Sequence, residues 1–111
     1  MLAKKYKLPV KEFLANKSKV VFKSDVLSVK SAQNKFQYSR FGSIISKKTA
    51  AKATKRNRIK RTVFDFIRAK KAHLVPGKDV LITVFPKAAG MDKNQFQKEL
   101  ALSVEKIFGA K

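Results

Sequence analysis

The sequence predicts a single α+β domain over residues 1–111, with three helices packed on a mixed sheet of three or four strands in two layers. Its length suits one domain, and its 44% apolar residues are enough to build one hydrophobic core. The expected order of elements is helix, strands, helix, strand, helix, which brings both strand orientations into one sheet. No repeat or low-complexity linker divides the chain into two parts.

The elements before the middle of the chain are short. Pro9 can begin a helix, because its missing N–H would have no partner there, and residues 11–17 are expected to form that helix. Residues 20–30 are rich in β-branched side chains and predict a strand. We expect a polar connection over 31–34, a second strand running in the opposite direction over 37–46, and a basic loop over 47–53.

Residues 54–73 predict the long helix. Apolar side chains fall within about 100° of one another around this helix and should face the core, namely those of Ile59, Val63, Phe66 and Ile67. Asn57, Arg61 and Arg68 lie on the far side. Pro76 and Gly77 mark a turn, and residues 79–85 are apolar without alternation, which predicts a strand buried on both faces.

The last helix has a recognisable start. Asp92 can cap it and Gln95 completes a capping box, while Met91 and Phe96 are placed to form a hydrophobic staple across the cap. Gly109 stands where a C-terminal capping glycine belongs. The buried stripe is expected to contain Phe96, Leu100, Val104 and Ile107 or Phe108.

Charge is the main indication of function. Twenty-seven Lys and Arg residues oppose seven acidic residues, which gives a net charge of +20. Residues 1–71 carry 21 of the basic and 3 of the acidic groups. A polyanion would relieve the self-repulsion, and nucleic acid is the leading candidate because each neutralised phosphate releases counterions. A basic protein without such a partner is the alternative.

Several classes of protein are disfavoured by residues and segments that the sequence lacks. Without cysteine, disulfides, thiolate catalysis and zinc ribbons are excluded. No apolar run is long enough to span a bilayer, and no apolar stretch follows the basic start, so we expect a cytoplasmic protein without a membrane partner. The single histidine, His73, and the scattered Asp65, Asp79 and Asp92 offer no catalytic or metal-binding group for a protein-only nuclease.

The most informative segment runs from residue 47 to residue 71, with eleven basic residues and one acid, Asp65. Like charges at i, i+4 destabilise an isolated helix, so this pattern favours an anionic neighbour. Guanidinium groups at 56, 58 and 61 can bind phosphate oxygens in pairs, and Asn57 can both donate to and accept from a sugar or base. The alternative is a solvated helix face, although such faces normally alternate in sign.

These residues also resemble a known family. Arg56-Asn57-Arg58-Ile59-Lys60-Arg61 is similar to the "RNR" signature helix of bacterial ribonuclease P proteins. Weaker matches flank it, namely Leu8 with Phe13, Arg40-Phe41-Gly42 leading into Ser46-Lys47-Lys48, Leu74 to Val80, and Pro86 to Ala89. The resemblance covers nearly the whole chain.

The resemblance implies a two-layer α/β sandwich like the second domain of ribosomal protein S5, with three helices on a mixed, four-stranded sheet. It also implies a protein subunit that binds a catalytic RNA and the 5′ leader of precursor tRNA. The RNA, with Mg²⁺, would cut off the leader, so that no protein side chain is catalytic and none binds metal. A ribosomal or general RNA-binding protein without a processing role remains the alternative, and a membrane-surface peptide is less favoured because the long helix needs its apolar face for the core.

The same resemblance suggests two groups of site residues. RNA-binding residues would be Lys48, Lys52, Lys55, Arg56, Asn57, Arg58, Lys60, Arg61 and Arg68. The leader cleft would contain Phe13, Lys17, Val26, Ser28, Ile44 and Ser46, with Phe13 either under a leader base or in the core. This chain departs from the family pattern at Lys17, Ser28, Phe64 and Phe85, and Phe64 is expected on the outer side of the long helix.

Overall fold

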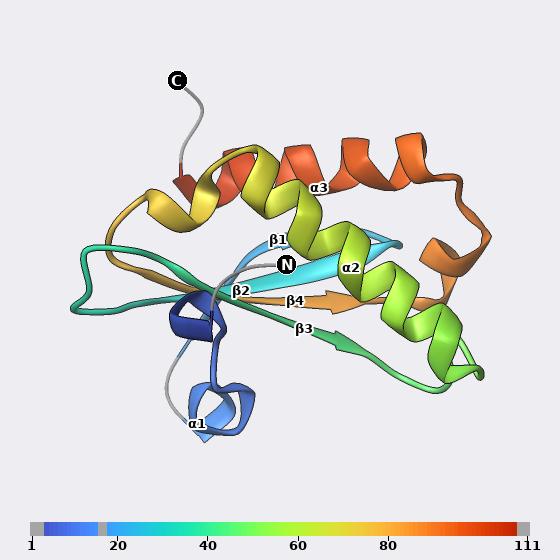
Figure 1. The fold of residues 1–111 in the computed structure, drawn as a ribbon, viewed down its shortest axis with the longest axis horizontal. Helices are drawn as coiled ribbons and strands as arrows, with labels where there is room; N and C mark the ends of the chain where they lie inside the picture. Colours follow the sequence, from blue (N-terminus) through green and yellow to red (C-terminus); the bar gives the residue numbers. More distant parts are fainter. Residues whose placement is uncertain (1–3, 16–17, 109–111) are drawn as a thin grey trace.

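The computed structural model describes residues 4–15 and 18–108 and shows a four-stranded mixed sheet with helices on both faces (Figure 1). The strand order is β1-β2-β4-β3, in which β3 and β4 are parallel and the other neighbours antiparallel. In chain order the helices and strands are η1 (Lys4–Tyr6), α1 (Val10–Ala15), β1 (Lys19–Lys23), β2 (Leu27–Gln33), β3 (Arg40–Ile45), α2 (Ala53–Ala69), η2 (Ala72–Leu74), β4 (Lys78–Val84), η3 (Pro86–Gly90) and α3 (Lys93–Phe108). The predicted α+β class and the mixed, four-stranded sheet are confirmed.

The larger core lies between the sheet and the two long helices. Helices α2 and α3 cover one face of the sheet, and α1 lies on the opposite side (Figure 1). Strand β4 occupies the centre of the sheet, and five of its seven residues are buried. This confirms the strand expected over 79–85. The helix-side cluster includes Leu27, Val29, Phe41, Val63, Phe66, Ile67, Val80, Ile82, Phe96, Leu100 and Ile107.

A smaller core attaches the N-terminal segment to the other face, which we call the open face. Leu8, Phe13 and Leu81 form this cluster. The backbone of Leu8 donates to the carbonyl of Phe41 at 3.0 Å, so the segment before α1 runs beside β3. A Cβ at Gly42 would lie 3.1 Å from Val10 Cγ2 and 3.2 Å from Leu8 Cβ, tighter than most carbon contacts. Glycine at this position therefore lets the segment approach the sheet closely.

The single strand expected over residues 20–30 is wrong, because a turn divides it into β1 and β2. The hydroxyl of Ser24 accepts from the backbone N–H groups of Val26 and Leu27 at 3.1 and 3.3 Å, which stabilises the reversal. The connection expected over residues 31–34 is also misplaced. Residues 31–33 extend β2, and the loop between β2 and β3 covers residues 34–39.

The long helix ends earlier than expected. Lys71 adopts a left-handed conformation with φ of 55°, so α2 stops at Ala69 and His73 falls in the short helix η2. The capping box of α3 is confirmed, since Gln95 N–H donates to Asp92 Oδ1 at 2.8 Å and Asp92 N–H to Gln95 Oε1 at 3.3 Å. Gly109 and the side chain of Phe108 lie outside the described residues.

Candidate nucleic-acid interface

The solvent side of α2 carries a group of polar and basic side chains. Asn57, Arg58 and Arg61 are exposed and, together with Thr54, line a shallow depression of about 300 Å³. Arg68 is exposed further along the same helix. The ion pairs between described residues join Arg40 to Asp79 and Lys87 to Asp25, so neither uses a cation of α2. The guanidinium groups of this face are therefore available to external phosphates.

Arg56 has a different environment from its neighbours in the signature segment. Its side chain is half-buried, and its Nη1 donates to the carbonyl oxygens of Ala50 at 2.8 Å and Ala51 at 2.9 Å. These carbonyls belong to the loop of residues 46–52, which leads into α2. In this structure Arg56 holds the loop against the helix instead of projecting from the solvent face.

The loop of residues 46–52 has further anchors. Thr49 is buried, and its hydroxyl donates to the carbonyl of Val84 at the end of β4, at 3.0 Å. The backbone N–H groups of Thr49 and Ala50 both donate to the carbonyl of Ser46. The loop thus presents its lysines from a fixed backbone. The exposed lysines in the loop and on α2 are Lys47, Lys48, Lys52, Lys55 and Lys60.

Two of the expected leader-cleft residues lie on the open face, one on each side of the central strand. Ser28 of β2 and Ile44 of β3 both pair with Thr83 of the central strand, so the three lie in one row across the sheet. All three side chains are partly exposed. Ser46 is exposed just beyond the end of β3, beside the basic loop. Thr83 was not predicted from the sequence, because β4 was expected to be buried on both faces. Thr83 lies two residues after Leu81 on the same strand, so the two side chains share the open face.

Three other expected cleft residues are placed differently. Val26 is 3% exposed and belongs to the helix-side core, because the turn at Ser24 breaks the alternation that would have put it beside Ser28. Phe13 is 4% exposed and packs on Leu81, which favours its alternative role as a core residue. Lys17 lies outside the described residues.

The two aromatic departures from the family pattern also have clear positions. Phe64 is 2% exposed and belongs to the helix-side core, so its expected place on the outer side of α2 is wrong. The apolar face of α2 is wider than the stripe read from the sequence, because it packs on both the sheet and the neighbouring helix. Phe85 follows β4 and is partly exposed.

The acidic and histidine side chains of the described residues do not form a metal-binding cluster. No three His, Cys, Asp or Glu side chains among residues 4–15 and 18–108 are grouped to hold a metal ion. His73 is almost buried, and desolvation lowers its pKa from the ordinary value. In the same described ranges, no helix is long and apolar enough to cross a membrane.

Comparisons with known proteins agree with one another. The sequence model of a family described as Ribonuclease P matches residues 10–107. Two curated proteins named "Ribonuclease P protein component" are each 41% identical to the chain. The protein from Synechocystis aligns over 63 residues, or 57% of this chain and 51% of its own length. The protein from Cyanothece aligns over 70 residues, or 63% and 53%. The chain thus matches about half the length of these curated relatives.

Solved structures match over more of the chain. A structure of a Staphylococcus aureus RNase P protein mutant, described as defective in mRNA degradation activity, superimposes with a TM-score of 0.81 at 28% identity. This match covers 95% of the chain and 89% of that protein. The RNase P protein from Thermotoga maritima superimposes with a TM-score of 0.79 at 24% identity, over 90% and 96% of the two chains, and supports the fold alone.

Proposed function

Because this chain belongs to the ribonuclease P protein family, we propose that it is the protein subunit of a ribonuclease P holoenzyme. In this role it binds a catalytic RNA and the 5′ leader of precursor tRNA. It thereby assists the Mg²⁺-dependent removal of the leader, which leaves the mature 5′ end of the tRNA. The proposed place of action is the cytoplasm.

The observation that carries the proposal is the solvent face of α2. Asn57, Arg58 and Arg61 lie together there, and their side chains are exposed and form no ion pair with another described residue. Arginine forks fit phosphate oxygens in pairs, while an amide can donate to and accept from a ribose hydroxyl. Such a face is suited to the sugar–phosphate backbone of a structured RNA.

We assign different tasks to the two sides of the molecule. The basic face of α2 and the loop of residues 46–52 would hold the RNA subunit and the substrate backbone near the site of cleavage. The row formed by Ser28, Thr83 and Ile44 would accommodate part of the single-stranded leader. Ser46 joins the two surfaces, since it follows β3 directly and begins the loop.

The protein's contribution is affinity and positioning. Under this proposal, Mg²⁺ belongs to the chemistry supplied by the RNA subunit. Correct placement of the scissile phosphate would raise the rate without any catalytic side chain from this chain.

A ribosomal or general RNA-binding protein without a processing role would show the same charge and a similar face. Reconstitution separates the two functions. The protein is added to a matching catalytic RNA at low Mg²⁺, and cleavage of precursor tRNA is measured. We expect accurate 5′ cleavage that neither component gives alone. RNA binding without any stimulation of cleavage would contradict the proposed function.

A further inference from the structure

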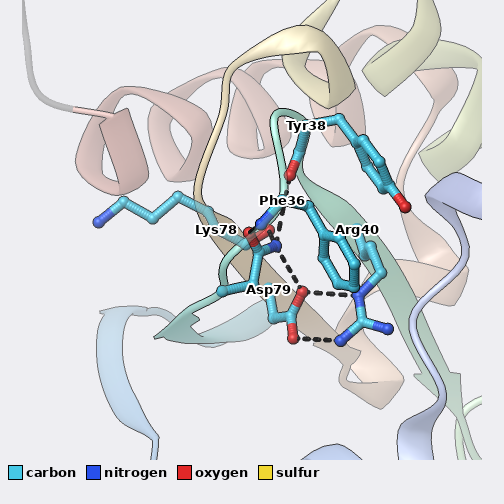
Figure 2. Close-up of polar contacts among 6 residues, drawn as sticks. Phe36, Tyr38, Arg40, Lys78 and Asp79 are labelled. Carbon is cyan, nitrogen blue, oxygen red and sulfur yellow. Dashed lines mark hydrogen bonds and ion pairs between the residues drawn. The ribbon is translucent and has the colours of Figure 1, made fainter.

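At the other end of the sheet from the α2 N-terminus, the loop of residues 34–39 carries two aromatic side chains that the proposed function does not use. Phe36 is 43% exposed, although it is large and apolar. Its ring stacks on that of Tyr38 at 5.1 Å between centroids and 15° between planes. The Arg40 guanidinium carbon lies 4.9 Å from the centroid of the Phe36 ring (Figure 2). We call Phe36, Tyr38 and Arg40 the aromatic platform.

The backbone beneath the platform is fixed by many hydrogen bonds. The side-chain amide of Asn34 donates to the carbonyls of Tyr38 and Lys78 and to Asp79 Oδ1, all within 3.3 Å. Its oxygen accepts from the N–H of Phe36 at 2.9 Å. Its own backbone N–H donates to the carbonyl of Gly77. A loop held at both ends in this way presents its rings in one arrangement before any ligand arrives.

The cation of the platform is also held in place. Arg40 Nε and Nη2 donate to the two carboxylate oxygens of Asp79 at 2.9 and 2.6 Å, a fork-to-fork pair visible in Figure 2. Asp79 is almost buried in the central strand β4. The hydrogen bonds to Asp79 raise the pKa of Arg40. The two hydrogen bonds to Asp79 also fix the plane of the Arg40 guanidinium beside the Phe36 ring.

A series of rings connects the platform to the interior. The rings of Tyr38 and Tyr6 form a T-shaped pair at 5.3 Å between centroids, and those of Tyr6 and His73 form another at 4.6 Å. Exposure falls along this series, from Phe36 at 43% to His73 at 9%. Lys5 adds a second cation, with its Nζ 5.2 Å from the centroid of the Tyr38 ring. The exposed Phe36 ring is therefore backed by packed aromatic groups, with the Arg40 cation beside it and Lys5 over the neighbouring Tyr38 ring.

We propose that the aromatic platform stacks against an unpaired base of single-stranded RNA, and that this base belongs to the precursor-tRNA leader. The inference rests on the proposed function for the identity of the RNA. A flat π-face beside cations suits a nucleotide, whose base stacks while its phosphate meets lysine or arginine. A second copy of this chain would bring another net charge of +20 to the same surface, which disfavours self-association here.

The position of the platform favours the leader over the RNA subunit. Arg40 begins β3, and by strand alternation it shares the open face with Gly42 and Ile44. The rise of β3 separates Arg40 from Ser46 by roughly 20 Å. A leader that starts near the basic loop and lies on the open face reaches Phe36 only with its distal nucleotides. The platform should therefore matter for long leaders and have no effect on short ones.

The first test measures stacking with the isolated protein and a short unstructured oligouridylate. Phe36→Ala should weaken binding by about 5- to 150-fold, the range typical of one base on one ring. Phe36→Trp should retain the affinity, whereas Phe36→Leu, which keeps apolar bulk without a π-face, should lose it. Leu102→Ala removes a similarly exposed apolar side chain from α3 and serves as the matched control, with no change expected. Full affinity of Phe36→Leu would overturn stacking.

The second test uses the reconstituted holoenzyme and precursor tRNAs with leaders of increasing length. Phe36→Ala should weaken the binding of substrates with long leaders and leave those with short leaders unchanged. A loss that is independent of leader length would overturn the assignment to the leader and indicate a base of the RNA subunit. If wild-type protein stimulates cleavage and Phe36→Ala binds all substrates like wild type, the inference fails while the proposed function stands. Absence of stimulation by the wild type would contradict the proposed function itself.

Discussion

The salt dependence of RNA binding is the sharpest measure of the α2 face, and the double variant Arg58→Ala/Arg61→Ala is designed to change it. The exposed cations that can meet phosphates are Lys48, Lys52, Lys55, Arg58, Lys60, Arg61 and Arg68. Arg56 is left out because its Nη1 is already bound to two carbonyls. If about six phosphates are neutralised, the slope of log K against log salt is about −4 to −5.

The expected change follows from the number of contacts removed. Each phosphate contact contributes about 0.7 to 0.9 to the slope, so losing two leaves a slope of about −3 to −4. Between 50 and 200 mM salt, wild-type affinity should therefore fall about 250- to 1000-fold, and that of the variant only about 60- to 250-fold. Fluorescence anisotropy with the matching catalytic RNA, repeated at several salt concentrations, measures both slopes.

A matched control is available on α3. Lys98→Ala/Lys106→Ala also removes two exposed positive charges, but from a helix outside the proposed interface. It should leave the slope nearly unchanged, since the slope depends on the number of phosphate contacts and not on the net charge alone. Circular dichroism should show both variants folded. An unchanged slope for Arg58→Ala/Arg61→Ala, or equal changes in both variants, would refute the assignment of this face to RNA.

Four further outcomes are expected. Arg56→Ala should lower the free energy of unfolding by about 1 kcal/mol in urea titrations, because the carbonyls that it binds lose a donor, and an unchanged value would argue against its role in holding the loop. Asp92→Ala should cost about 1 kcal/mol, or roughly 4 °C in thermal unfolding, because the capping box is lost. Phe13→Ala should cost about 3–5 kcal/mol as a core truncation, whereas a stable variant that binds long leaders poorly would restore its role in base stacking. Desolvation holds the pKa of His73 in the folded protein below its unfolded value of 6.5. The stability that neutral His73 contributes is therefore present above pH 6.5 and is lost as the pH falls through the folded pKa. His73→Phe should lack this part of the pH dependence in denaturation curves.

The sequence was most informative where local rules decide the structure. The capping box at Asp92 and Gln95 depends on residues three positions apart, and the structure contains both of its hydrogen bonds. The apolar character of residues 79–85 correctly predicted a buried strand, since only a central position hides both faces. The exposure of Asn57, Arg58 and Arg61 likewise follows from helical periodicity.

The predictions were wrong where contacts between distant residues, or a single side chain, determine the local structure. The Ser24 hydroxyl stabilises a turn that divides one expected strand into a hairpin. The β-branched residues on either side of Ser24 favour a strand, so the turn was not predicted. Phe64 is buried because a second helix packs beside α2, which the periodicity of α2 alone does not indicate. The roles of Arg56 in the loop and of Phe36 on its platform also depend on residues brought together by the fold.

The central position of β4 has a consequence for biosynthesis. Strands β2 and β3 flank β4 and do not pair with each other, so the sheet cannot close until residues 78–84 have left the ribosome. Helix α2, with its cluster of positive charge, is made before that strand. At about 5–20 residues per second, synthesis of residues 70–84, which complete β4, takes roughly 1–3 s. During that interval the nascent chain carries a polycationic segment without its supporting sheet, and early capture by a polyanion would compete with correct folding.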